Sequence, residues 1–322
     1  MTDPPAADAL AEVRRAVRAA LGRLPAQVRE APLVVGCSGG ADSMALLLAA
    51  HAERPGGVVA AIVDHRLQEG STDRSEALAV ALRARGIDAR VHAVTVEGPG
   101  GTEAAARRAR YAALAAARPH PCSPVLLGHT LDDQAETVLL GLGRGSGARS
   151  LAGMREWDEP WLRPLLGLRR DRLRAAACGG DPVPWEDPHN TDPRFVRARL
   201  RAEAIPLLDD VLAGGVAEAL ARTAAQLRED DEALTVWADR VREAARDGNT
   251  LRVDVLGGAP AAVRRRVLRA WLLESGATAV TDAHLRAADD LVGAWRGQGG
   301  PRLPGGLDVV REHGRLVPAR PG

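Results

Sequence analysis

Short apolar runs alternate with segments of helical periodicity along the first half of the chain. The apolar runs have the length of buried strands and fall at residues 33–35, 58–63, 89–96 and 125–127. Helix-forming segments follow them at residues 44–52, 75–85, 102–117 and 131–142. Strands that alternate with helices predict a parallel sheet joined by right-handed crossovers, which is an α/β fold.

The pattern on either side of these segments predicts a leading helix and a long loop. Residues 6–24 carry apolar side chains at helical spacing. Residues 182–193 are rich in Pro, Asp and Asn, a composition typical of a loop. We expect the segment that follows this loop to end at Pro206, because proline interrupts a helix interior.

The last third of the chain predicts a second, smaller domain. Its expected elements are one long helix or a helical pair at 211–245, helices at 261–274 and 282–291, and a hairpin region at 297–318. We therefore divide the chain into an α/β domain, residues 1–210, and a mainly helical domain, residues 211–322. A length of 322 residues is consistent with two domains.

Composition excludes several classes of protein. The cysteines Cys37, Cys122 and Cys178 are far apart and form no C-x-x-C pair, which argues against a disulfide framework, a zinc site or a cluster site. No apolar stretch has transmembrane length, and the N-terminus lacks the pattern of a signal peptide. We therefore expect a cytoplasmic protein that does not enter a membrane.

The charge is small overall but unevenly distributed. The formal net charge is +1, while residues 144–201 hold 12 arginines against 8 acidic residues. A local excess of arginine is a modest indication of a phosphate-bearing partner, although a solvated basic face explains it equally well.

The turn after the first predicted strand has the composition of a phosphate-binding loop. Residues 33–49 read LVVGCSGGADSMALLLA, in which a strand, a glycine turn and a helix follow one another. In this geometry backbone N–H groups converge on a phosphate, and glycines allow close approach. Asp42 can hold a metal ion against the phosphates. The chain contains no lysine, so this is not the ordinary G-x-x-x-x-G-K-[ST] loop.

Two further polar groups follow predicted strands at the same edge of the sheet. Asp64 and His65 end the second strand, and His129 to Asp133 follow the fourth. Ligands bind beyond the carboxyl ends of parallel strands, so we expect these groups near the loop. Asp133 and Glu136 are three residues apart on a predicted helix and share a face. Acidic residues that only complement the helix dipole are the alternative, which explains Asp132 better than Glu136.

Several ordered blocks together resemble the tRNA(Ile)-lysidine synthase family of PP-loop ATP pyrophosphatases. The blocks are SGGADS (38–43), VDHRLQEGS (63–71), TEAAARRARYAAL (102–114), GHTLDDQAETVLLGLGRGSGARSLAGM (128–154), RPLL (163–166) and WEDPHNTDPRFVRARLR (185–201). The chain departs from the family pattern at Arg66 and Gln68, which replace Gly and Arg, and at Ala198, which replaces Asn.

The resemblance implies a two-step reaction on the isoleucine tRNA that carries the anticodon CAU. ATP, with Mg²⁺, would adenylate the C2 oxygen of the wobble cytidine and release pyrophosphate. Free L-lysine would then attack C2 and expel AMP, giving lysidine and changing codon reading from AUG to AUA. The family is often dimeric, so a homodimer is one expectation.

The resemblance also assigns roles to residues of this chain. Asp42 and Asp133 would be catalytic, and Asp42 would hold the metal. The expected ATP-binding residues are Ser38, Gly39, Gly40, Ala41, Asp42, Ser43, Ile62, Asp64, His65 and His129. The expected lysine-binding residues are Asp132, Asp133 and Glu136. The expected phosphate or tRNA contacts are Arg107, Arg144, Arg197, Arg199 and Arg201, for which surface or helix-terminal arginines are the structural alternative.

Three other functions compete with this interpretation. A tRNA-thiolating PP-loop enzyme would need cysteines placed to carry sulfur. An amidotransferase-type ligase would use the same loop with ammonia, but residues 128–154 do not match that group. A non-catalytic nucleotide-binding module would keep the glycines but has little need for Asp42 or for the Asp133 and Glu136 pair.

Overall fold

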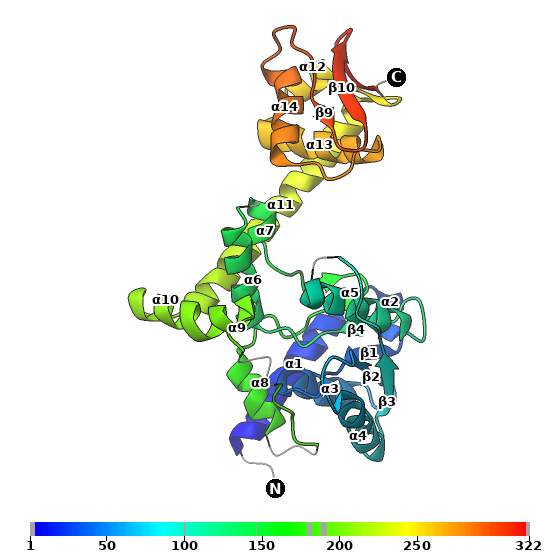
Figure 1. The fold of residues 1–322 in the computed structure, drawn as a ribbon, viewed down its shortest axis with the longest axis vertical. Helices are drawn as coiled ribbons and strands as arrows, with labels where there is room; N and C mark the ends of the chain where they lie inside the picture. Colours follow the sequence, from blue (N-terminus) through cyan, green and yellow to red (C-terminus); the bar gives the residue numbers. More distant parts are fainter. Residues whose placement is uncertain (1–3, 100, 146, 179–181, 188–191, 320–322) are drawn as a thin grey trace. The chain divides into compact units, whose positions relative to one another are not determined.

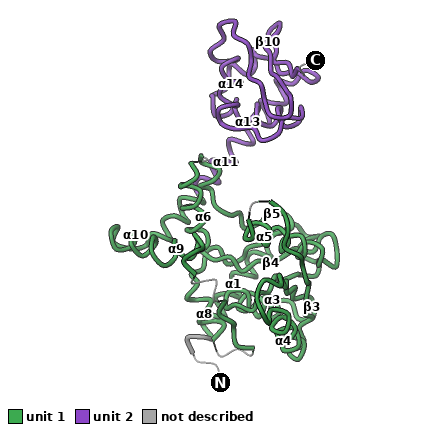
Figure 2. Tube along the Cα trace, in the orientation of Figure 1, with its two compact units in different colours: residues 1–225 green, residues 226–322 purple. Residues whose placement is uncertain are grey.

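The computed structural model describes residues 4–99, 101–145, 147–178, 182–187 and 192–319. The chain divides into two compact units, residues 1–225 and 226–322, shown in different colours in Figure 2. The division falls inside the long helix α11, Val216–Ala245. In the described residues, no helix combines the length and the apolar character needed to cross a membrane.

The first unit is built on a six-stranded sheet. Its strands are β1 Leu33–Gly36, β2 Val58–Asp64, β3 Asp88–Ala93, β4 Val125–Leu126, β5 Trp157–Asp158 and β6 Trp161–Leu162. The strand order is β3-β2-β1-β4-β6-β5, and every pairing is parallel except that of β5 with β6. The predicted parallel α/β sheet is confirmed, and β1 lies at its centre.

Helices cover both faces of this sheet (Figure 1). The helices of the first unit are α1 Pro4–Gly22, α2 Ala26–Glu30, α3 Ala41–Glu53, α4 Ser71–Ala84, α5 Gly101–Ala116, α6 Leu131–Gly143, α7 Ala148–Leu151, α8 Arg170–Ala177, α9 Val196–Arg199 and α10 Ile205–Val211, with a π-helical turn, η2 Leu200–Ala204, between the last two. Not all of them lie on the sheet, since α9 and α10 project away from it (Figure 1).

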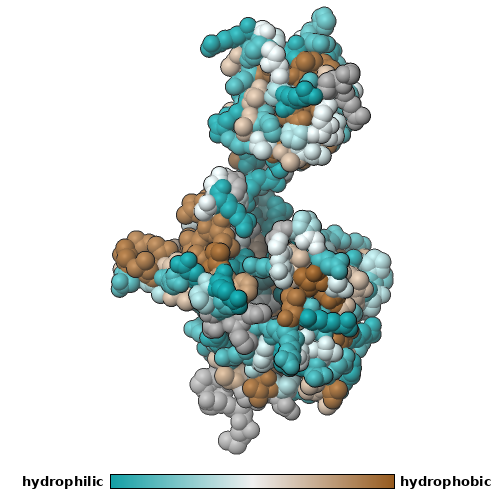
Figure 3. All heavy atoms as spheres, viewed as in Figure 1, coloured by the Kyte–Doolittle hydropathy of each residue, from teal (hydrophilic) through white to brown (hydrophobic). Residues whose placement is uncertain are grey.

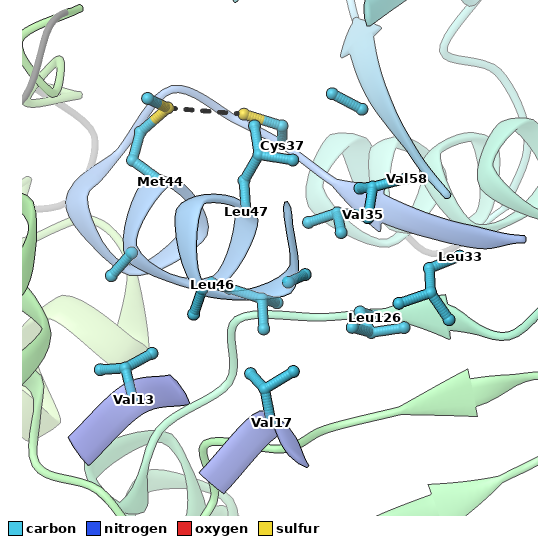
Figure 4. Packing of buried hydrophobic residues seen from close by; sticks show 14 of the residues in the cluster. Val13, Val17, Leu33, Val35, Cys37, Met44, Leu46, Leu47, Val58 and Leu126 are labelled. Carbon is cyan, nitrogen blue, oxygen red and sulfur yellow. Dashed lines mark hydrogen bonds between the residues drawn. The ribbon is translucent and has the colours of Figure 1, made fainter. Parts of the chain in front are cut away.

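Alternate residues of β1 divide the core of this unit between the two faces. Leu33 and Val35 pack with α1, α3, α4 and α8, whereas Val34 packs with Leu114 of α5 on the other face. Figure 4 shows Leu46 of α3 near Val17 of α1 in the larger of these two clusters. Burial on both faces explains why β1 is apolar throughout.

Several predicted boundaries were wrong for identifiable reasons. Pro206 does not end a segment but occupies the first turn of α10, where its missing N–H leaves no bond unmade. Residues 212–215 then form a turn that contains Gly214 and Gly215 at positive φ, so the long helix begins only at Val216. Helix α4 begins at Ser71, earlier than expected. Helix α5 begins at Gly101, one residue before the expected start.

Apolar side chains gather on the surface of α10. Leu207, Val211 and the adjoining Leu212 are each more than half exposed, and Figure 3 shows hydrophobic side chains over this helix.

The second unit combines helices with a five-stranded antiparallel sheet. The helices are α12 Val253–Gly257, α13 Ala261–Glu274 and α14 Asp282–Gly293. The strands are β7 Arg246–Asp247, β8 Thr250–Arg252, β9 Arg302–Leu303, β10 Leu307–Glu312 and β11 Arg315–Ala319, in the order β7-β8-β11-β10-β9. The hairpin of β10 and β11 lies in the predicted hairpin region, whereas β7 and β8 were not predicted.

Close packing of α6 against α7 predicts the effect of a single methyl group. A Cβ added to Gly141 would overlap the carbonyl oxygen of Ser150 and lie 2.9 Å from its carbonyl carbon. That overlap costs about 1–3 kcal/mol, more than the about 1 kcal/mol that alanine gains over glycine in a helix. We expect Gly141→Ala to lower the free energy of unfolding measured in urea.

Gly143 of the same helix provides the matched control. No atom lies within 4 Å of its added Cβ, so Gly143→Ala should leave stability unchanged or raise it slightly. Equal stabilities for the two variants would contradict the packing described here.

Candidate active site

The turn between β1 and α3 presents unoccupied backbone donors. The Ser43 hydroxyl accepts the N–H of Ser38 at 3.1 Å and donates to the carbonyl oxygen of Gly40 at 2.9 Å, which fixes the shape of the loop. Gly39 has a φ of 82°, a conformation that favours glycine. The N–H groups of residues 40–43 donate to no acceptor among the described residues. This loop at the N-terminus of α3 can therefore bind an anion.

A glycine brings the fourth strand against this loop. A Cβ added to Gly128, just after β4, would lie 3.1 Å from the carbonyl carbon and oxygen of Asp42. Only a residue without a side chain allows this approach without displacing the start of α3. Gly128 thereby places His129 and the start of α6 beside the loop, as the topology of the sheet predicted.

A cavity of about 610 Å³ opens beside the loop. Its walls include Gly39, Ile62, His65, Leu78, Arg110 and Trp185. This volume falls within the range of small-molecule sites, about 300–1,000 Å³.

Residues 182–187 form part of that wall. The N–H of Trp185 donates to the carbonyl oxygen of Gly39 at 3.0 Å, and the guanidinium of Arg74 lies 4.8 Å from the centre of the indole ring. Gln68 donates to Asp187 at 3.2 Å and accepts from Arg74 at 3.1 Å. Gln68, one of the departures from the family pattern, therefore ties this segment to α4.

Asp64 organises the start of α4 at the edge of the cavity. Its buried carboxylate accepts the N–H of Arg66 at 3.0 Å and the hydroxyls of Ser71 and Thr72 at 2.8 and 2.7 Å. Burial opposes ionisation, but these hydrogen bonds outweigh it and hold the pKa of Asp64 below its usual range. Both oxygens of Asp64 are thus engaged within the protein, and the bonds explain why α4 begins at Ser71.

The other departures from the family pattern also have structural consequences. Arg66 has a φ of 55°, in the left-handed region where glycine is normal and other residues are strained. Ala198 is buried in α9 and lacks the side-chain amide that the Asn of the family pattern would offer for hydrogen bonds.

Three carboxylates and one arginine meet where α3, α6 and α8 begin. Arg170 donates to Asp42 at 3.2 Å and to Asp133 at 2.7 Å, and it lies 3.7 Å from Glu136. Its backbone N–H donates to Asp132 at 2.8 Å, while Arg169 lies 3.3 Å from the same carboxylate. Sequence reasoning did not single out Arg170, although it bridges the three predicted carboxylates.

Asp133 has a structural role as well as a place in this cluster. Its carboxylate accepts the N–H and the hydroxyl of Thr130 at 2.8 and 2.9 Å, completing a capping box at the start of α6. Burial opposes ionisation here too, but Arg170 and the bonds from Thr130 lower the pKa of Asp133. The dipole-complementing role that sequence reasoning gave to Asp132 therefore falls also to Asp133.

The pKa of Asp42 is shifted in the opposite direction to that of Asp133. Burial, with a contribution from the nearby Asp133, raises its pKa despite the attraction of Arg170. Its Oδ1 atom is buried and has no hydrogen-bond partner among the described residues. No group of three or more His, Cys, Asp and Glu side chains suited to a metal ion occurs in the described part of the chain. Asp42 could thus contribute one ligand to an Mg²⁺ ion whose remaining ligands are phosphates and water.

Glu136 is fully buried and is bound by arginines. Arg201 contacts its carboxylate at 2.8 Å, Arg197 at 3.3 Å and Arg170 at 3.7 Å. The structure therefore brings together two predicted lysine-binding carboxylates and two predicted phosphate-binding arginines. Sequence reasoning did not predict that these residues pair with one another.

The remaining predicted arginines lie apart from this cluster. Arg199 pairs with Glu203 at 2.8 Å on the exposed face of α9. Arg107 donates to the hydroxyl of Tyr111 at 3.0 Å, and Arg144 is the exposed C-cap of α6.

Two arginines that have no carboxylate partner among the described residues lie near His129. Arg110 lines the cavity and forms no ion pair among the described residues, and burial lowers its pKa. Arg163 is buried and donates to the carbonyl oxygen of Arg155. Burial, with the field of these arginines, lowers the pKa of His129 to about 3, so the imidazole is neutral at pH 7. The sequence did not predict a role for Arg110 or Arg163, although both lie in blocks that match the family pattern, residues 102–114 and 163–166.

The neutral His129 predicts a specific pH dependence of stability. Between pH 6.5 and about 3 the unfolded chain binds a proton on this histidine that the folded chain does not bind. The free energy of unfolding of the wild type relative to His129→Gln should therefore fall as pH decreases below 6.5, by up to about 1.4 kcal/mol per pH unit. Urea denaturation at pH 7 and pH 5 checks this, and identical pH profiles would refute it.

The strained backbone at Arg66 predicts a difference between two substitutions. A β-branched residue resists the left-handed region, so Arg66→Val should lower the free energy of unfolding by about 1–2 kcal/mol. Arg66→Gly relieves the strain and should be at least as stable as the wild type. Thermal unfolding of both variants measures the effect, and a valine variant as stable as the glycine variant would contradict it.

Family models match both parts of the chain. A PP-loop domain matches residues 13–208, and a TilS substrate binding domain matches residues 251–317. Among solved structures, the U34-tRNA thiolase NcsA from Methanococcus maripaludis, with its [4Fe-4S] cluster, aligns with a TM-score of 0.52. It is 19% identical and covers 69% of this chain and 80% of its own, a similarity that shows the fold alone.

Curated relatives are similar over most of their length. The tRNA(Ile)-lysidine synthase of Mycolicibacterium paratuberculosis is 58% identical over 84% of this chain and 85% of the relative. The enzyme of the same name from Rhodococcus erythropolis is 54% identical over 97% of this chain and 96% of the relative. That from Nocardia farcinica is 56% identical over 89% of this chain and 92% of the relative. With matching family models and this degree of identity, the chain belongs to the tRNA(Ile)-lysidine synthase family.

Proposed function

We propose that this protein ligates L-lysine to C2 of the wobble cytidine of tRNA(Ile) in an ATP-dependent reaction. Family membership supports the overall reaction. The structural observation that carries the proposal is the loop of residues 38–43, whose unoccupied N–H groups adjoin a buried cluster of carboxylates and arginines.

The first step is adenylation of the cytidine. The N–H groups of residues 39–43 bind the pyrophosphate end of ATP, and the cavity beside Ile62 and His65 holds the nucleoside. The C2 oxygen attacks the α-phosphorus, a new O–P bond forms, and the bond between the α-phosphorus and its bridging oxygen breaks to release pyrophosphate. Arg110 lines this cavity, has no carboxylate partner in the described part of the chain, and is suited to a phosphate oxygen.

Mg²⁺ fits this site through Asp42. The partnerless Oδ1 atom of that side chain would hold the ion, which when bound supplies positive charge beside the phosphates. The neutral His129 next to the loop adds no charge of its own.

The second step is the attack of lysine. The ε-ammonium group binds among Asp132, Asp133 and Glu136, and a carboxylate of this group accepts its proton. The free amine then attacks C2, a C–N bond forms, and the C2–O bond breaks so that AMP leaves. The low pKa of Asp133 keeps it charged, which suits binding of the ammonium.

The macromolecular substrate is tRNA(Ile) with a CAU anticodon. Arg107, Arg144, Arg197, Arg199 and Arg201 are the proposed phosphate contacts, and the matched substrate binding domain is a second proposed contact region. A cytoplasmic location is part of this proposal. The homodimer stays a prediction.

The placement of the cysteines does not favour a thiolation reaction. Cys37 is buried in the core, where burial raises the pKa of its thiol, and its sulfur lies 3.7 Å from that of Met44. Cys122 precedes β4 and so lies at the edge of the sheet opposite the loop. Cys178 is exposed at the end of α8.

A direct assay tests the proposal. The protein is incubated with ATP, Mg²⁺, labelled L-lysine and bulk bacterial tRNA, and AMP release and labelling of tRNA are followed. We expect lysine-dependent AMP release and label in one isoleucine tRNA. ATP turnover that requires ammonia or a sulfur donor instead of lysine would contradict the proposal.

Removal of the charge of Asp42 should abolish labelling. Asp42→Asn keeps the shape of this partly buried side chain but loses the charge that is proposed to face the phosphates, so we expect a loss of at least about a hundredfold in rate. Asp88→Asn, at a half-exposed aspartate that pairs with Arg90, serves as the control. Normal labelling by the Asp42 variant would remove this residue from the mechanism.

A further inference from the structure

Each carboxylate proposed to bind lysine already pairs with an arginine in this structure, Asp132 with Arg169, and Asp133 and Glu136 with Arg170. Asp42, Asp133 and Glu136 supply three negative charges within one cluster. Arg170, Arg197 and Arg201 supply three positive charges against them. An ammonium group that entered this balanced and largely buried cluster would bring an uncompensated charge, which is unfavourable. An arginine must therefore leave before a lysine can bind here.

The three arginines differ in how firmly they are held. The side chain of Arg170 is 13% exposed and reaches all three carboxylates. The side chains of Arg197 and Arg201 are 36% and 34% exposed and both meet the fully buried Glu136. Arg197 also donates to the Thr137 hydroxyl at 3.4 Å. Arg197 and Arg201 are therefore the arginines that can turn toward solvent with the least loss.

Phosphate oxygens can draw these two side chains away. Guanidinium groups bind phosphate in a bidentate, charge-assisted manner, so a phosphate competes effectively with a single carboxylate. Arg197 and Arg201 lie on α9 and η2, one helical turn apart, which lets both reach one polyanion.

We propose that Glu136 is a shared binding site. Arg197 and Arg201 occupy it in the free protein, and the ammonium group of lysine binds it once a phosphate has drawn those arginines away. The inference rests on the proposed function and adds an order of binding to it. The phosphate-bearing substrate binds first and opens the lysine site. Lysine binding is thereby coupled to the presence of the phosphate-bearing substrate.

Equilibrium dialysis of labelled L-lysine tests this coupling. The wild type is measured alone, with Mg²⁺ and α,β-methylene-ATP, and with a tRNA(Ile) transcript. We expect at least one of the two phosphate ligands to tighten lysine binding about tenfold. The ligand that has this effect identifies the source of the phosphate. By reciprocity, lysine should tighten binding of that phosphate ligand by the same factor, which is measured without any variant. No change in either arm would overturn the proposal.

Variants test whether the arginines are the cause. Arg197→Gln combined with Arg201→Gln should bind lysine about tenfold more tightly than the wild type without any phosphate ligand, and the phosphate effect should disappear. Adding Glu136→Gln to this double variant should abolish the gain. Arg172→Gln is the matched control. It removes an arginine of α8 that pairs with Glu12 at 2.8 Å, and it should behave as the wild type.

The outcomes separate this inference from the proposed function. Folding of each variant is checked by circular dichroism, and the wild-type measurements stand without the variants. A double variant that is folded but binds lysine no more tightly than the wild type would refute the proposal that Glu136 is a shared binding site. If the wild type nevertheless labels tRNA with lysine, the proposed function stands and only the order of binding fails.

Discussion

Pairing between buried carboxylates and guanidinium groups is the interaction on which the rest of this site depends. Asp42 lies at the start of α3, Asp133 and Glu136 lie on α6, and Arg170 at the start of α8 joins all three. Unpaired charges at these depths would be costly, so the elements that carry them must meet. The same pairing affects the chemistry of the site. Arg170 helps to lower the pKa of Asp133, whereas burial outweighs Arg170 at Asp42 and raises the pKa of that carboxyl.

The sheet places this cluster beside the loop of residues 38–43, which is proposed to bind phosphate. Parallel strands β1, β2 and β4 end at one edge, and Gly128 allows β4 to approach the start of α3. Donors for an anion and a cavity of nucleotide size therefore adjoin the groups proposed to handle an ammonium. This adjacency is what a ligase needs, since the activated oxygen and the attacking amine must meet at one carbon.

Local sequence signals predicted one part of this arrangement and not the other. The loop, the parallel sheet and the shared face of Asp133 and Glu136 follow from periodicity and glycine placement over short stretches. Arg170 escaped notice because it meets Asp42 across 128 residues of sequence, and no local pattern reports such a pairing. The contacts of Arg197 and Arg201 with Glu136 depend likewise on the path of the chain after α8.

Binding of nucleotide phosphates by the loop is the central claim, and hydrogen–deuterium exchange measures it directly. The N–H groups of residues 40–43 have no acceptor among the described residues, so they should exchange rapidly in the free protein. Addition of Mg²⁺ and α,β-methylene-ATP should slow exchange in a peptide that covers this loop. Unchanged exchange there, at a nucleotide concentration that saturates the protein, would contradict the account.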